Sequence, residues 1–265
     1  MGALAGAGLD HVQISVQDTE RRAARLVAGA EAFDAKIAAA GLVKRAGLAL
    51  SLNVVLHSGN VDRAGEMVDL AASLGAERIE VASTQYHGWA LENRAALLPT
   101  RAALAAAAEA IKERRKQYAG ALDVVFVLPD YVTDLPKPCM DGWGQRSLTV
   151  APDGRVLPCP GATSITSLAF DNVLEKSLGD IWRTSRAFET FRGEAWMKEP
   201  CASCDRRGID FGGCRCQAFA LTGDASRTDP ACAKAPDHPI ILSARREAEE
   251  RLPRPSLVYR GLRQR

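Results

Sequence analysis

The chain has 265 residues, of which 47% are hydrophobic and 25% are charged, and its formal net charge is +2. These proportions are typical of globular proteins, and the length suits one large or two ordinary domains. So small a charge, with no basic stripe among aromatic residues, argues against nucleic-acid binding. No run approaches the roughly 18 apolar residues of a membrane span. No export signal is recognised at the start, so we expect a cytoplasmic protein with reduced thiols.

Four short apolar runs in the first half of the chain predict strands. Nearly continuous apolar runs are expected of strands covered on both faces. Strands that alternate with helices form βαβ units with right-handed crossovers. The pattern therefore predicts an α/β fold that forms part of a parallel barrel. The predicted strands are 11–16, 48–56, 78–82 and 123–128.

Three helical patterns separate these strands. The first is one long helix over 26–41 that ends at its last glycine. Asn60 is expected to cap the second helix, which Gly75 ends, and Thr100 to cap the third, which runs to about Tyr118. Three such βα units do not close a barrel, so either the sequence is incomplete or something else covers the sheet. The abrupt start, where Gly and Ala lead straight into a strand, favours an incomplete sequence.

Polar side chains interrupt the apolar strands. Residues two apart in a strand share a face, and a barrel filled only for stability carries Val, Ile or Leu at its inner positions. We therefore expect a polar ligand at the carboxyl ends of the strands, near Ser15, His57 and the loop 83–90. The polar inner positions are Gln13, Ser15, Ser51, Asn53 and Glu80.

Seven cysteines lie in the second half of the chain. An odd number excludes complete pairing into disulfides, and seven thiolates with one further ligand would fill two four-ligand sites. A Cys-x-x-Cys turn serves zinc and iron–sulfur sites alike, so two zinc sites with His238 as the eighth ligand remain an alternative. The cysteines are Cys139, Cys159, Cys201, Cys204, Cys214, Cys216 and Cys232.

Glycine and proline become frequent and helices shorten from residue 129 onward. Residues 146–159 predict a hairpin that turns at 152–154. An amphipathic helix is expected over 177–192, with its apolar side facing inward. The inward residues are Leu178, Ile181, Trp182, Phe188 and Phe191, and Trp143 is expected in the core beside them.

The cysteine pattern is similar to the SPASM extension of radical S-adenosylmethionine (SAM) enzymes that modify peptides. Within that class the whole chain resembles the PqqE family of pyrroloquinoline quinone (PQQ) biosynthesis. The likeness rests on Cys139, Gly154-x4-Cys159, Cys201-x2-Cys204, Cys214-x-Cys216, Cys232, Asp171-Asn-Val173, Ile181-Trp182, His11-Val-Gln-Ile-Ser, Thr84-Gln-Tyr-His-Gly-Trp-Ala-Leu-Glu-Asn-Arg-Ala and Cys201-Ala-Ser-Cys-Asp-Arg-Arg-Gly-Ile-Asp-Phe-Gly-Gly-Cys-Arg-Cys-Gln-Ala.

The resemblance implies the C-terminal part of a partial (β/α)6 radical SAM barrel over 1–130. A SPASM domain with a β-hairpin and short helices is implied over 131–240, and a basic C-terminal helix or tail over 241–265.

The resemblance also implies an activity, namely the joining of a glutamate and a tyrosine by a carbon–carbon bond within the precursor peptide PqqA. The implied partners are PqqA, the peptide chaperone PqqD and an external electron donor. The implied cofactors are SAM, bordered by Ser15 and Asn53, and two auxiliary iron–sulfur clusters. Auxiliary cluster I would use Cys139, Cys159, Cys214 and Cys216, and auxiliary cluster II would use Cys201, Cys204, Cys232 and Asp210.

One departure from the family is large. Its radical-forming Cys-x3-Cys-x2-Cys motif has no counterpart, because no cysteine precedes Cys139. We therefore expect a member truncated at its amino end that does not cleave SAM by itself. The alternatives are a SPASM enzyme for another peptide, or a non-catalytic zinc- or cluster-binding module that holds a peptide. Tyr86, His87 and Trp89 are expected on an active-site loop.

Overall fold

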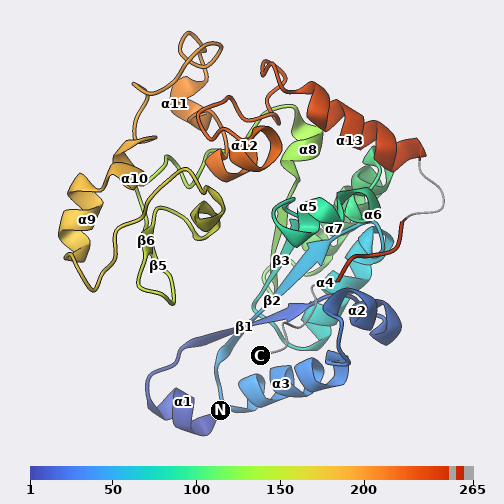
Figure 1. The fold of residues 1–265 in the computed structure, drawn as a ribbon. Coiled ribbons are helices and arrows are strands. Elements are labelled where there is room, and N and C mark those ends of the chain that lie inside the picture. The colour runs from blue at the N-terminus through green and yellow to red at the C-terminus, as the bar shows by residue number, and fades with distance from the viewer. Residues whose placement is uncertain (251–254, 260–265) are drawn as a thin grey trace. The chain divides into compact units, whose positions relative to one another are not determined.

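The structure is a computed structural model that describes residues 1–250 and 255–259, and its contacts divide the chain into two compact units (Figure 1). Of the described residues, 1–85, 89–129, 246–250 and 255–259 form what we name the sheet unit. Residues 86–88 and 130–245 form the cysteine unit. Parts of the predicted tail, 251–254 and 260–265, lie outside the described residues, and the domain limits given above stay predictions.

The sheet unit is built on four parallel strands in the order β1-β2-β3-β4. In the register of the sheet, Ser15 pairs with Asn53 and Asn53 pairs with Glu80. The predicted α/β class, the parallel sheet and the shared face of the polar residues are thereby confirmed. The strands are β1 (His11–Val16), β2 (Ala49–Leu56), β3 (Arg78–Ser83) and β4 (Asp123–Val127).

Helices cover the other face of this sheet, as Figure 1 shows for α3 and α4. Leu50, Leu52 and Val54 of β2 point to that side and are at most 1% exposed. Their burial against helix side chains supplies the main favourable free energy of this unit. The helical segments are α1 (Gly2–Gly6), α2 (Arg21–Ala28), α3 (Phe33–Arg45), η1 (Val61–Arg63), α4 (Ala64–Ser73), α5 (Trp89–Glu92), α6 (Arg94–Leu97) and α7 (Arg101–Gln117).

Two helix predictions in this unit are wrong in detail. The long first helix is two helices, because Gly29 adopts a left-handed conformation (φ +68°) that ends α2, and α3 continues past Gly41 to Arg45. Asn60 is the N-cap residue of η1, which leads into α4, but its side chain makes no cap hydrogen bond. Its Oδ1 accepts from the His57 N–H, and its Nδ2 donates to the carbonyls of Gln17 and Val55.

The predicted cap at Thr100 is confirmed. Its side-chain oxygen accepts the N–H of Ala103 at 3.1 Å, and α7 ends at Gln117, with Tyr118 as its C-cap. One of the first-turn N–H groups that a helix leaves unpaired is thereby satisfied.

The cysteine unit has little regular structure apart from one hairpin and several short helices. The predicted hairpin is confirmed and turns at Gly154 (φ +84°), where an added Cβ would lie 2.4 Å from Asn172 Oδ1. Asn172 closes the turn by donating to the Asp153 carbonyl. The elements are α8 (Asp130–Thr133), β5 (Thr149–Val150), β6 (Val156–Leu157), η2 (Pro160–Ser164), α9 (Leu178–Thr184), α10 (Arg186–Glu189), α11 (Arg207–Asp210), α12 (Arg215–Thr222) and α13 (Pro239–Glu250), of which α13 continues beyond this unit.

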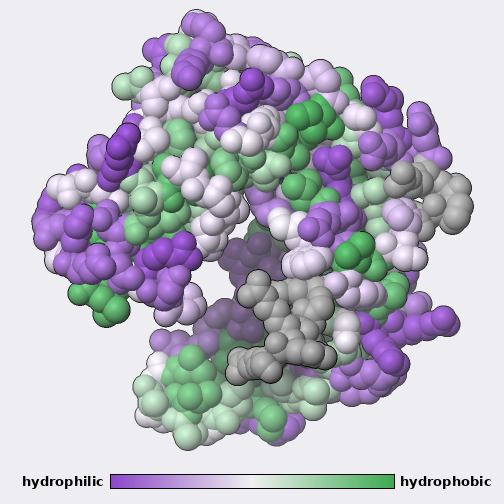
Figure 2. All heavy atoms as spheres, in the orientation of Figure 1, coloured by the Kyte–Doolittle hydropathy of each residue, from purple (hydrophilic) through white to green (hydrophobic). Residues whose placement is uncertain are grey.

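The helix predicted over 177–192 is also two helices. Ser185 is extended between α9 and α10, and Ser177 caps α9 by accepting the Asp180 N–H. Leu178, predicted to face inward, is 41% exposed, whereas Ile181 and Phe188 are fully buried. Figure 2 shows that the surface around α9 is largely hydrophilic.

The described residues contain no candidate membrane-spanning helix. None of the helices in 1–250 and 255–259 combines the length and the apolar character that crossing a bilayer requires.

Candidate metal centres

Four cysteine thiols gather inside the cysteine unit, and we name this group site I. Cys159 is the N-cap residue of η2, two residues beyond the end of β6, and Cys214 is the N-cap residue of α12, which carries Cys216 in its first turn. The Sγ atoms of Cys159 and Cys216 lie 3.7 Å apart, although 57 positions separate these residues. The members of site I are Cys139, Cys159, Cys214 and Cys216.

Hydrogen bonds within site I lower the pKa of two of its four thiols, Cys214 and Cys159. Hydrogen bonds from Cys139 and Cys216 lower the pKa of Cys214 well below its usual range. The hydrogen bond to Cys214 raises the pKa of Cys139, and hydrogen bonds to Cys159 and then to Cys214 raise the pKa of Cys216, since these protons are held between sulfur atoms. Metal ions bind thiolates, so they would take the place of these shared protons.

Apolar side chains close around site I. Trp143 is 2% exposed and donates its indole N–H to the Ala187 carbonyl, which confirms its predicted place in the core. It meets Phe191 edge to face at 5.5 Å between ring centroids. Gly161 lets the backbone pass close to the sulfurs, since an added Cβ would lie 3.3 Å from Cys216 Sγ. Site I is therefore a group of thiols packed among apolar side chains.

His87 borders site I through Cys214, a role that the sequence did not predict. A side-chain hydrogen bond to Cys214 raises the pKa of His87 despite its burial. Its Nδ1 is buried and has no hydrogen-bond partner among the described residues. Tyr86, from the same predicted loop, is buried against Tyr131 with 4.7 Å between ring centroids. Trp89 belongs to the sheet unit and is 44% exposed.

The remaining three cysteines meet Asp210 elsewhere in the cysteine unit, and we name this group site II. A cavity of about 20 Å³ is lined by all four predicted ligands. Asp210 is 6% exposed, and its carboxylate accepts the Gly212 N–H at 3.1 Å and Arg206 Nε at 3.3 Å. The members of site II are Cys201, Cys204, Asp210 and Cys232.

Two polar groups attend the sulfurs of site II. Lys234 Nζ donates to Cys204 Sγ at 3.3 Å, and Thr228 Oγ1 lies 3.3 Å from Cys201 Sγ. Lys234 places a positive charge beside Cys204 Sγ, which is a predicted metal ligand. Hydrogen bonds to a metal ligand orient it and tune its affinity for the metal. Neither residue was predicted, because single lysines and threonines carry no pattern in a sequence.

The donor atoms fit two different kinds of centre. Site I offers sulfur alone, which soft metals prefer, and site II adds the harder carboxylate oxygen of Asp210. Within 1–250 and 255–259, no three His, Cys, Asp or Glu side chains have the arrangement of a single-ion site. His238, the alternative zinc ligand, is held by the Pro230 carbonyl at 2.9 Å from Nδ1, and its Nε2 lies 3.8 Å from Asp134.

The two residues predicted to border SAM lie side by side in the sheet unit. Ser15 is on β1 and Asn53 is its register partner on β2. Ser15 lines a cavity of about 150 Å³ at the carboxyl ends of the strands, together with His57 and Thr84. Asn53 is not among its lining residues. This cavity lies where parallel α/β folds bind ligands.

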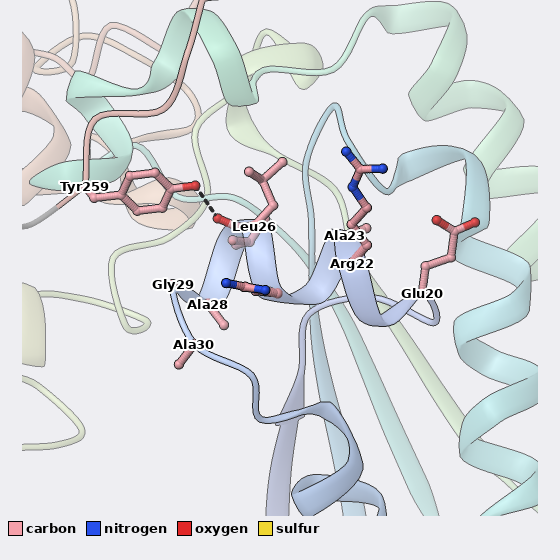
Figure 3. Close-up of a pocket in the computed structure, with 10 residues that line it drawn as sticks. Glu20, Arg22, Ala23, Leu26, Ala28, Gly29, Ala30 and Tyr259 are labelled. Atoms are coloured by element: carbon pink, nitrogen blue, oxygen red, sulfur yellow. Dashed lines mark hydrogen bonds between the residues drawn. The ribbon is translucent and has the colours of Figure 1, made fainter.

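A broader hollow in the sheet unit involves none of the predicted residues. It is about 1200 Å³ and open, and residues of α2 line it with Tyr259 (Figure 3). The Tyr259 hydroxyl donates to the Leu26 carbonyl at 2.6 Å. Next to it, the buried Asn93 side chain accepts the Val258 N–H at 2.7 Å and donates to the Val258 carbonyl at 2.9 Å.

Comparison with known proteins finds a family match over part of the cysteine unit. Residues 139–205 match the SPASM family, described as an iron–sulfur cluster-binding domain. The PqqA peptide cyclase of Streptomyces rochei is 54% identical over 258 residues, which cover 97% of this chain and 71% of that enzyme. The PqqA peptide cyclase of Methylocella silvestris is 52% identical over 263 residues, covering 98% and 70% respectively.

Solved structures show the likeness in fold. The crystal structure of Streptococcus suis SuiB bound to S-adenosylmethionine aligns with a TM-score of 0.64 at 17% identity. That of SuiB bound to its precursor peptide SuiA aligns with a TM-score of 0.63 at 16% identity. In each case the match covers 84% of this chain and 53% of the solved one, so this chain spans about half of their length.

Proposed function

Because the chain belongs to the PqqA peptide cyclase family and has the fold of a partial radical SAM barrel followed by a SPASM domain, we propose that it acts in PQQ biosynthesis. The reaction is the joining of a glutamate and a tyrosine by a carbon–carbon bond within the PqqA precursor peptide. The peptide is presented by PqqD, and electrons come from an external donor in the cytoplasm.

One observation carries this proposal, namely the gathering of seven cysteines and Asp210 into sites I and II. Bound there, two iron–sulfur clusters would supply one-electron transfer. Cys139, Cys159, Cys214 and Cys216 would hold one of them, and Cys201, Cys204, Cys232 and Asp210 the other. The apolar shell of Trp143 and Phe191 keeps water from site I, which lowers the local dielectric and strengthens the effect of nearby charges.

The sheet unit is proposed to hold SAM at the polar ends of its strands. Ser15 and Asn53 present a hydroxyl and an amide from neighbouring strands, and such groups suit a ligand with ribose hydroxyls and charged amino-acid groups. The small cavity beside Ser15, with His57 and Thr84, supports this assignment.

We also propose that residues 1–265 alone do not cleave SAM reductively. The Cys-x3-Cys-x2-Cys motif that binds the radical-forming cluster in this class does not occur in the sequence, where Cys139 is the first cysteine. What residues 1–265 are expected to retain is the ability to bind the two auxiliary clusters.

Anaerobic reconstitution with iron and sulfide tests the proposal. We expect a brown protein with iron and acid-labile sulfide, whose electron paramagnetic resonance (EPR) spectrum contains two reducible centres. Cys216→Ser should remove one centre and Cys204→Ser the other. Ser203→Ala, which changes an exposed neighbour of Cys204 that binds Glu199, should remove neither. A colourless protein with about two zinc ions in two four-ligand sites would instead favour the non-catalytic module.

The substrate is tested separately, with PqqA, PqqD, SAM and a reductant. Residues 1–265 should bind PqqA but form no 5′-deoxyadenosine by mass spectrometry. Release of 5′-deoxyadenosine would contradict the expected inactivity. Failure to bind PqqA, with the clusters present, would favour a SPASM enzyme for another peptide.

A further inference from the structure

Arg215 carries a buried positive charge without a carboxylate bonded to it. The residue is 1% exposed, and its guanidinium stacks over the Trp196 ring at 4.7 Å from the centroid. No ion pair joins it to an Asp or Glu anywhere in residues 1–250 and 255–259. Among these described residues, the hydrogen bonds of its guanidinium go to main-chain carbonyls, those of Gly212, Gly213, Ala225 and Arg227.

Such a cation is costly unless negative charge lies near. Carbonyl dipoles and an aromatic face stabilise a guanidinium in part. Burial nevertheless lowers the pKa of Arg215, and negative charge on Asp229, Cys139, Cys214 and Cys201 acts against that shift. The sulfurs among these groups come from both candidate metal centres.

The position of Arg215 in the chain and in the fold brings it close to sulfurs of both sites. It stands between Cys214 and Cys216 of site I in the sequence. On its other side lies Gly212, where an added Cβ would be 3.3 Å from Arg215 Nη2 and 3.7 Å from Cys201 Sγ of site II. Arg215 therefore adjoins two ligands of site I along the chain, and its guanidinium lies near a ligand of site II.

Asp229 links the same two sites through its hydrogen bonds. It is fully buried, its Oδ2 accepts the Cys214 N–H at 2.7 Å, and its main-chain carbonyl accepts the Cys232 N–H at 2.9 Å. Gln217 Nε2 donates to the other carboxylate oxygen at 2.8 Å. Gly213 (φ +81°) leaves space for the Asp229 side chain, since a Cβ added at Gly213 would lie 2.4 Å from Asp229 Cβ.

We propose that Arg215 is an electrostatic tuning residue shared by both auxiliary clusters, and that Asp229 fixes the ligand loops around it. This inference rests on the proposed function, because it requires clusters in sites I and II. Reduction adds negative charge to a cluster, and a buried cation within reach of both stabilises both reduced states. Net charge and hydrogen bonding near a cluster set its potential, so Arg215 holds both midpoint potentials at less negative values.

Redox titration of the reconstituted chain, followed by EPR, tests this assignment. Arg215→Met should make each cluster at least about tenfold harder to reduce, which for one electron corresponds to about 59 mV. Arg215→Lys keeps the charge and should move both equilibria by less than about twofold, less than 20 mV on the same scale. Arg227→Gln is the matched control. Its cation is half exposed and pairs with Asp237, so solvent screens it and neither potential should change.

Each outcome decides the question. A shift of only one cluster in Arg215→Met overturns the shared role, and equal shifts in the Met and Lys variants overturn the role of charge. If Arg215→Met takes up no iron, Arg215→Gln replaces it. Should both neutral variants lose the clusters while the Lys variant keeps them at unchanged potentials, the charge requirement is supported. Loss of the clusters in the Lys variant as well would overturn it. An unsubstituted chain without iron refutes the proposed function itself, whereas iron-loaded chains with unmoved potentials refute only the role of Arg215.

Discussion

The sheet unit and the cysteine unit reach a folded state by different means. The first buries aliphatic side chains such as Leu50, Leu52 and Leu56 under helices. The second buries cysteines, two guanidinium groups and three carboxylates, with Arg215 and Asp229 among its least exposed residues. Burial of charge opposes folding unless partners compensate for it. The contrast teaches that hydrophobic patterning specifies the sheet unit, whereas the cysteine unit depends on what its ligands bind.

The strongest test of this contrast is removal of the metal. We expect iron-free protein to lose about 4 kcal/mol or more of stability in the cysteine unit, the linkage expected for a ligand at a thousandfold excess over its Kd. Amide exchange by mass spectrometry should then rise across 130–245 and stay unchanged in the strands of the sheet unit. Equal protection with and without iron would contradict the contrast.

Leu52→Ala is the reverse test, directed at the sheet unit. Leu52 is 1% exposed, so the cavity should cost about 2–5 kcal/mol in unfolding free energy. Val55→Ala on the same strand is the control, because Val55 is 40% exposed and its loss should cost well under that. Iron content should remain that of the parent chain in both variants.

Gly213→Ala probes the crowded loop of the cysteine unit. Its Cβ would meet Asp229 Cβ at 2.4 Å and Pro136 Cβ at 2.7 Å at a positive φ. Strain and overpacking together should cost about 2–4 kcal/mol. Gly223→Ala has a similar φ of +76° with nothing within 4 Å of the added carbon, so thermal unfolding should show only the backbone cost of about 1 kcal/mol. Equal losses of stability in the two variants would mean that crowding against Asp229 adds nothing to the cost of Gly213→Ala.

The smallest effect is expected at Glu77 in the sheet unit. Hydrogen bonds from Lys44 and the Leu50 N–H lower the pKa of Glu77. A lowered folded pKa adds stability above the unfolded pKa, and that stability is lost as the pH falls through the folded pKa. The side chain is 54% exposed, so Glu77→Gln should cost less than about 1 kcal/mol at pH 7. Denaturant titrations should show the two proteins converging below about pH 4, under the ordinary glutamate pKa.

The sheet was predictable because its signal is local. Apolar runs marked each strand, and Thr100 marked the start of α7 through a capping pattern that depends on neighbouring residues only. The helix limits were wrong where the same local pattern fits one continuous helix or two shorter ones. Gly29 ended a helix that apolar spacing alone would continue, and Ser185 interrupted another. The buried role of Asn60 depends on the carbonyls of Gln17 and Val55, which no local pattern reveals.

The candidate centres were predictable only in part. Cysteine spacing indicated soft-metal sites, and resemblance to a family chose Asp210 among nearby aspartates. His87, Arg215, Asp229 and Lys234 were missed, because their importance comes from contacts made across the folded chain. The arginine between two cysteines in Cys214-Arg-Cys216 was the one available cue, since thiolates beside a cation can offset the cost of burying it.

The two hydrogen bonds between the Asn93 side chain and the Val258 main chain have a consequence for sequence variation at position 258. The amide engages only the main-chain N–H and carbonyl of Val258, whose own side chain is more than half exposed. Related chains can therefore exchange nearly any amino acid at this position without loosening the attachment. Proline is the exception, because its ring nitrogen has no hydrogen to offer.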